Sequence, residues 1–209
     1  MALGVLLLIL CVLPAGMSRS AWMAVAISGI WVYATYRSWG TSLRKIGRKY
    51  KKRVFPAIIA GGMVLIIVGY ALFQLKVDSA NGRLLIWKVS VMAIVEKPLL
   101  GHGTGNFASA YGMAQEKYFS QKEFTSTEEL VAGSPEYAFN EYLQIAVEYG
   151  ALFLLVVLLI IVFCLWIGIT EKRLSACAGL ISVLVFAFSS YPMQIPGFAI
   201  AFYFLLAAC

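Results

Sequence analysis

The chain has 209 residues and a net charge of +7, and 61% of its residues are hydrophobic while 13% are charged. A mean hydropathy of +0.84 excludes a soluble globular domain, because in such domains roughly a quarter of the residues are charged. The apolar runs lack the alternation of barrel strands, and a helix pairs its backbone groups within its own segment. The composition therefore predicts an all-α integral membrane protein.

Apolar runs along the chain predict a polytopic helical bundle, because roughly 20 apolar residues are needed to cross a bilayer. The predicted spans are residues 2–17, 21–36, 54–75, 151–169 and 174–190. The first run also resembles the core of a secretory signal, although it lacks a basic start. A last run, 197–209, is too short to cross alone, so we expect the chain to be cut from a longer one.

The distribution of basic residues predicts the orientation. Residues 37–53 hold eight of the 17 basic residues, which favours a cytoplasmic connection under the positive-inside rule. Such a basic run can also bind nucleic acid, but between two membrane helices we expect anionic lipid headgroups as its partner and no nucleic acid.

Three parts of the chain follow from this orientation. Residues 1–75 form three transmembrane helices with the basic cytoplasmic loop at 37–53. Residues 76–149 form one large periplasmic loop with short helices, and residues 150–209 form two further spans and a partial third. The loop holds the single histidine and nine of the ten acidic residues, so any chemistry is expected there.

Within the loop, short elements are predicted from caps and breakers. A helix is expected at 83–96 and ends at Pro98, a turn at 101–105 precedes a helix from Asn106, and Ser126 with Glu129 has capping-box spacing. Ser134-Pro135-Glu136 predicts the start of a helix that runs on into the span at 151–169.

The last predicted helix carries a polar face. At 100° per residue, Asn140, Glu141, Gln144 and Glu148 fall within an arc of about 100°. This face is either simply solvated or the polar wall of a cavity at the membrane surface.

These features occur in an order that resembles the O-antigen ligase and polymerase superfamily, in its C-terminal half. The resemblance rests on Ser18-Arg19, GRLLIW from Gly82, EKPLLGHGTGNF from Glu96 and FNEYLQIAVEYG from Phe139. It implies a polytopic glycosyltransferase of the bacterial inner membrane. Such an enzyme moves a glycan from a polyprenyl-diphosphate carrier to a lipid or glycan acceptor on the periplasmic side. As the mechanism we expect a single displacement without a metal, which inverts the anomeric centre.

The resemblance also implies roles for basic residues. Arg19 and Arg83 match arginines that hold the carrier diphosphate, and a guanidinium suits that role because it binds phosphate oxygens in bidentate fashion. Lys88 and Lys97 are weaker candidates for the same group. The alternatives are a topology-setting charge for Arg19 and a solvated position for Arg83.

One position departs from the family pattern. Asn140 and Gly150 keep the family spacing, but Phe139 stands where the pattern has a histidine. Two residues are candidates to replace it as a base. His102 is one of them, because histidine is the side-chain type used as a base near neutral pH, and Glu141 is the other if its pKa is raised. The alternatives are a backbone-bonded turn residue for His102 and a solvated carboxylate for Glu141, while a polar residue near Asn140 orients the acceptor.

The glycines of GHGTGNF suggest a tight turn that redirects the chain, with a phosphate cradle as the second interpretation. No Gly-Lys-Ser/Thr follows, so a nucleotide site is not indicated. No metal or other cofactor is expected, because the loop has one histidine and no cysteine. The four cysteines lie in apolar runs and are expected to be small core residues.

Other functions remain open from the sequence. A polysaccharide polymerase or a protein O-oligosaccharyltransferase of the same family differs only in its acceptor. A transporter for lipid-linked glycans needs polar groups within its spans, and these spans have almost none. A non-catalytic assembly protein would use the loop for binding.

Overall fold

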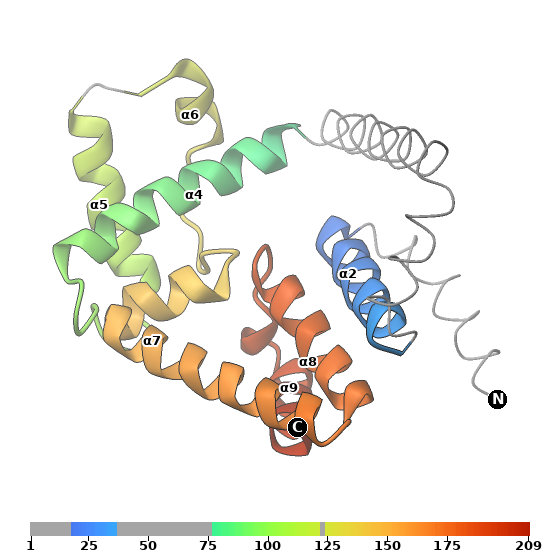
Figure 1. Cartoon of the computed structure of the whole chain (residues 1–209). Coiled ribbons are helices and arrows are strands. Elements are labelled where there is room, and N and C mark those ends of the chain that lie inside the picture. The colour runs from blue at the N-terminus through green and yellow to red at the C-terminus, as the bar shows by residue number, and fades with distance from the viewer. Residues whose placement is uncertain (1–17, 37–76, 122–123) are drawn as a thin grey trace, which may run out of the picture.

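The structure is a computed structural model that describes residues 18–36, 77–121 and 124–209, and every regular element in these ranges is helical. Figure 1 shows α4–α6 gathered at one end of α7, with α8 and α9 beside its other part and α2 next to α8. The helices are α2 (Arg19–Tyr36), α4 (Val77–Glu96), α5 (Phe107–Ser120), α6 (Ser126–Val131), α7 (Glu141–Thr170), α8 (Leu174–Ala187), the 3-10 helix η1 (Pro192–Gln194) and α9 (Pro196–Ala208).

The predicted spans that fall in these ranges are helical. α7 contains the run 151–169, and within the described residues it is the one helix long and apolar enough to cross a membrane. The apolar helices α2, α8 and α9 are shorter. The predicted spans at 2–17 and 54–75 and the basic connection at 37–53 lie outside the described residues.

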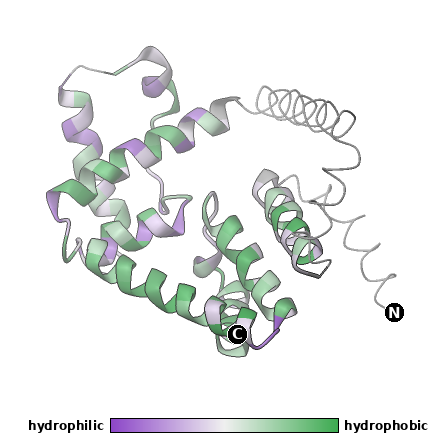
Figure 2. Ribbon diagram, viewed as in Figure 1, coloured by the Kyte–Doolittle hydropathy of each residue, from purple (hydrophilic) through white to green (hydrophobic). Residues whose placement is uncertain are grey.

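Two hydrophobic cores share α7. The first joins α4 and α5 to the first turns of α7 through Leu85, Val89, Phe107, Tyr111 and Val147. The second joins the apolar part of α7 to α8 and α9, and its buried residues include Ile161, Cys177, Leu180, Phe202 and Cys209. Figure 2 shows the same division. Hydrophobic residues follow the later part of α7, and hydrophilic residues occur on α5, on α6 and in the first turns of α7. The predicted loop helices therefore have a core of their own.

The elements predicted in the loop are present, with corrections at their ends. The helix predicted at 83–96 is α4, which starts earlier, at Val77, and the helix expected from Asn106 is α5. The capping box lies one residue before the predicted pair, since Thr125 and Glu128 form it.

The predicted helix start at Ser134 is wrong. α7 begins at Glu141, where the side-chain oxygen of Asn140 accepts hydrogen bonds from the N–H groups of Tyr142 at 3.0 Å and Leu143 at 3.2 Å. The preceding segment stays irregular because Ala138 is bonded elsewhere: its N–H donates to Gln144 and its carbonyl accepts from Trp87. Tertiary contacts thus outweigh the local helix-start pattern.

A helix break at Gly150 divides α7 into a polar first part, 141–149, and the apolar part that follows. Gly150 has φ 84° and ψ 168°, a backbone conformation open almost only to glycine. The carbonyls of Val147 and Glu148 accept hydrogen bonds from the N–H groups of His102 and Gly103, both at 2.8 Å. The N–H of Ala151 donates to the carbonyl of Pro98 at 2.7 Å. The turn predicted at the glycine cluster is confirmed, and it docks on this break.

We expect Gly150→Ala to lower the stability of the protein by more than about 2 kcal/mol. A Cβ at this position overlaps the carbonyl group of Leu99, and the φ of 84° is strained for any other residue. The thermal unfolding midpoint of the full chain in detergent measures the effect.

Gly112→Ala is the matched control, because the Cβ meets nothing within 4 Å on α5 and alanine favours helix. It is expected to keep or slightly raise the midpoint. Equal midpoints for the two variants would contradict a close contact at Gly150.

Candidate functional site

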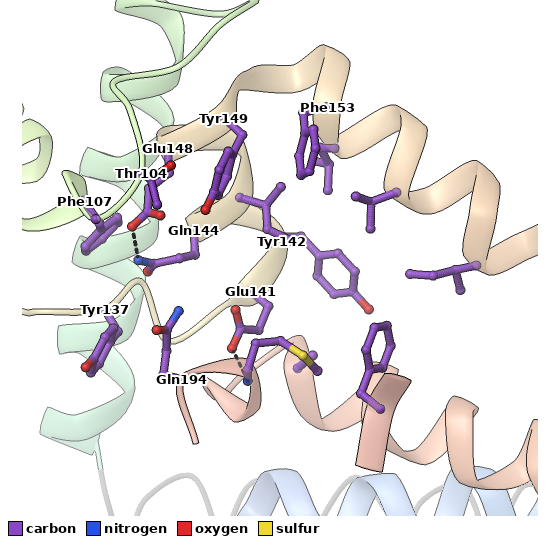
Figure 3. Close-up of a pocket in the computed structure, with 18 of the residues that line it drawn as sticks. Thr104, Phe107, Tyr137, Glu141, Tyr142, Gln144, Glu148, Tyr149, Phe153 and Gln194 are labelled. Carbon is purple, nitrogen blue, oxygen red and sulfur yellow. Dashed lines mark hydrogen bonds between the residues drawn. The ribbon is translucent and has the colours of Figure 1, made fainter. Parts of the chain in front are cut away.

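A cavity of about 860 Å³ lies where the polar and apolar parts of α7 meet, bounded by α8, α9, η1 and the start of α5. Figure 3 shows its polar side chains gathered at one end. The polar lining comprises Thr104, Glu136, Tyr137, Glu141, Tyr142, Gln144, Glu148, Tyr149, Gln194 and Tyr203, and the apolar lining includes Phe153, Leu154, Val157, Ile161, Leu184 and Phe202. The cavity is therefore amphipathic, with its apolar end beside the predicted span.

Glu141 is a buried carboxylate in the wall of this cavity, in the part of α7 that precedes the span. Its side chain is 4% exposed, and one carboxylate oxygen accepts a hydrogen bond from the N–H of Met193 at 2.7 Å. Burial raises the pKa of Glu141 to about 6, with a smaller increase from the charge of Glu148 and a partial offset from the Met193 bond. The group is thus poised to exchange a proton near neutral pH.

Glu148 is held in place by Gln144. The side-chain amide of Gln144 donates to a Glu148 carboxylate oxygen at 2.7 Å, and the amide oxygen of Gln144 accepts from the N–H of Ala138 at 2.8 Å. Because the Ala138 N–H is a donor only, this contact defines which way the amide points. Glu141, Gln144 and Glu148 thus line a cavity, whereas Asn140 caps the helix.

Arg83 contacts the end of α8. Its guanidinium donates to the carbonyl of Ser189 at 3.1 Å, and the hydroxyl of Ser20 donates to the same carbonyl at 3.2 Å. The hydroxyls of Ser20 and Ser189 also lie 2.7 Å apart. Ser20, the residue after Arg19, therefore contacts the same oxygen as Arg83. The side chain of Arg19 itself is not among those that the structure describes.

Aromatic side chains connect Arg83 to the cavity. Its guanidinium carbon lies 5.4 Å from the ring centroid of Phe139. Phe139 packs on Tyr191 with 5.2 Å between centroids, and Tyr191 stacks on Tyr137, a cavity residue, at 5.1 Å. The position where the family pattern has a histidine is thus occupied by a ring that contacts both Arg83 and Tyr191.

Lys88 of α4 contacts α5 and α6. Its ammonium donates to the hydroxyl of Tyr118 at 2.6 Å and to Glu128 at 2.8 Å. These contacts raise the pKa of Lys88, and the pKa of Glu128 falls to about 2, chiefly through the hydrogen bond from Lys88. The pair links α4, α5 and α6, so the structure does not bring Lys88 together with Arg83.

His102 is bonded to backbone on both sides. Its ring Nε2 lies 2.9 Å from the carbonyl oxygen of Ala93, and its backbone N–H donates to the carbonyl of Val147. It does not line the cavity. This geometry matches the alternative of a backbone-bonded turn residue.

The residues that sequence reasoning missed lie in the connection between α8 and α9. Ser189 meets Arg83, the N–H of Met193 holds Glu141, and Gln194 lines the cavity. The two prolines at 192 and 196 mark this connection as irregular backbone, and that was the available signal. Within the described residues, no three His, Cys, Asp or Glu side chains are grouped to hold a metal ion.

The described residues define a helical protein with an amphipathic cavity beside one helix that is long and apolar enough to cross a membrane. Comparison with protein families shows that the chain belongs to the O-antigen ligase family, which it matches over residues 4–158. Members are membrane proteins and glycosyltransferase-like enzymes. Neither the search of the curated proteins nor that of the solved structures finds a match. The matched region includes the first part of α7, while α8 and α9 follow it.

The pKa of Glu141 predicts a pH-dependent contribution to stability. Because this pKa rises from 4.5 to about 6 on folding, the folded state binds the proton more tightly, and stability is lost as pH rises through this range. The loss is at most about 2 kcal/mol. We therefore expect the unfolding midpoint of Glu141→Gln to rise relative to that of the wild type as the pH is raised from 4.5 to 7.

Glu116→Gln, an exposed change on α5, is the control and is expected to show no such gain. Parallel midpoints for wild type and Glu141→Gln across this pH range would mean that Glu141 is ionised normally.

Proposed function

We propose that this protein transfers a glycan from a polyprenyl-diphosphate carrier to a lipid or glycan acceptor at the periplasmic face of the bacterial inner membrane. Family membership supplies the class of reaction. One observation supports the assignment of residues: the connection between α8 and α9 contacts Arg83 at Ser189 and Glu141 at Met193. A cation and a proton acceptor are thereby held by the same short segment.

The donor diphosphate is bound by Arg83 and Arg19. As the glycosidic bond breaks, negative charge grows on the leaving diphosphate, and guanidinium groups stabilise that charge in the transition state. The shared carbonyl of Ser189 supports this pairing, because it draws the start of α2 and Arg83 together.

The acceptor is activated by Glu141. Its carboxylate takes the proton of the acceptor hydroxyl as the acceptor oxygen attacks the anomeric carbon. The bond from that carbon to the diphosphate oxygen breaks, the diphosphate keeps the electron pair, and the anomeric centre inverts. Asn140 is a positioning residue, since it caps the helix at Glu141.

Arg83→Ala is expected to reduce transfer by at least about 100-fold, because a transition-state charge loses its partner. The assay uses the full chain, a polyprenyl-diphosphate glycan and three acceptors: a lipid-linked saccharide, a second carrier-linked glycan and a polypeptide. The acceptor that reacts assigns ligase, polymerase or protein-glycosylation activity.

Arg173→Ala is the matched control, because it removes an arginine at the opposite end of α7, and it should retain transfer. Normal transfer by Arg83→Ala would remove this residue from the site. A transporter or an assembly protein would show no transfer with any acceptor.

Glu141 predicts an acid limb in the pH profile. Since its pKa is about 6, kcat/KM should fall about tenfold per pH unit below that value. Glu141→Gln should reduce the transfer activity roughly 100-fold or more and lack this acid limb. Glu116→Gln should keep both the activity and the limb. An unchanged acid limb in Glu141→Gln would assign the base to another residue.

A further inference from the structure

The ionised side chains that line the cavity are all acidic. Glu136, Glu141 and Glu148 face it, and no Lys, Arg or His stands among its described lining residues. Arg83 is not among the lining residues, and its guanidinium instead lies over Phe139, which packs on Tyr191. The cavity and the cationic position are therefore two distinct places with opposite charge.

Two of these carboxylates are buried and oriented. Glu141 and Glu148 are 4% and 7% exposed, and each has one oxygen held, by Met193 and by Gln144 respectively. For the second oxygen of either carboxylate, no hydrogen bond from a described residue is present. They stand seven residues apart, so they lie on one side of α7 about 10 Å apart along its axis. Oriented carboxylate oxygens along a cavity wall are acceptors for hydroxyl or ammonium groups.

The other end of the cavity is apolar. Phe153, Val157, Ile161 and Phe202 line it, deep along the part of α7 that is apolar enough to cross a membrane. An occupant that fills both ends has a hydrogen-bonding head and a hydrocarbon chain. Charge excludes the diphosphate from this place, because two anions at close range in a low-dielectric site repel strongly.

We propose that the cavity is the acceptor subsite. It binds a lipid-anchored sugar whose head is uncharged or bears an ammonium group. The carboxylate of Glu148, which Gln144 holds in place, excludes anionic heads from the cavity. This inference rests on the proposed function, since it assigns the acceptor to the cavity and the donor diphosphate to the arginines.

The experiment measures binding without transfer. The full chain in lipid nanodiscs is titrated with octylammonium, octyl β-glucoside and octyl phosphate, and the thermal unfolding midpoint is followed. We expect octylammonium and octyl glucoside to stabilise the wild type, and octyl phosphate to bind at least about tenfold more weakly. Glu148→Gln should weaken the binding of octylammonium about tenfold and leave the binding of octyl glucoside nearly unchanged.

Charge reversal gives the second arm. Glu148→Lys should invert the order, so that octyl phosphate binds better than octylammonium. Glu116→Lys changes the net charge equally on the exposed face of α5 and should keep the wild-type order. Inversion in both variants, or octyl phosphate binding the wild type as well as octylammonium, overturns the proposal.

The binding experiment and the transfer assay test the two proposals independently. The expected binding order without glycan transfer supports the subsite and removes the proposed reaction. Transfer with no dependence of binding on Glu148 supports the reaction and overturns this inference.

Discussion

The docking of the glycine turn on the break in α7 is the interaction on which the rest of the structure depends. A helix can leave its regular conformation in a buried place only if the freed backbone groups find partners. Here the N–H groups of His102 and Gly103 replace the helical donors, and Pro98 accepts from Ala151. Glycines at 101 and 150 allow the two backbones to meet, since a Cβ at either would overlap the other segment.

The break sets the polar turns of α7 apart from its apolar run and thereby makes room for the cavity. Glu141 and Glu148 lie on the polar side, where backbone and amide donors satisfy one oxygen of each carboxylate. Burial next to the apolar part then raises the pKa of Glu141. The same geometry that shapes the cavity thus tunes its chemistry.

The connection between α8 and α9 contacts both the cationic group and the acidic group. Ser189 contacts Arg83 and Met193 contacts Glu141. The rings of Phe139, Tyr191 and Tyr137 make consecutive contacts from Arg83 to the cavity lining. In the proposed function, the guanidinium binds the phosphate and the carboxylate accepts the proton of the hydroxyl.

Local properties of the sequence determined the helices, the apolar character of 151–169, the glycine turn and the polar face at Glu141, because each depends on residues within a few turns. Tertiary structure alone decided the start of α7, the partner of Lys88 and the cavity. The decisive contacts join residues far apart in the chain: 40 positions for Lys88 and Glu128, 52 for Glu141 and Met193, and 106 for Arg83 and Ser189. Such pairings follow from how the helices pack, which no local pattern encodes.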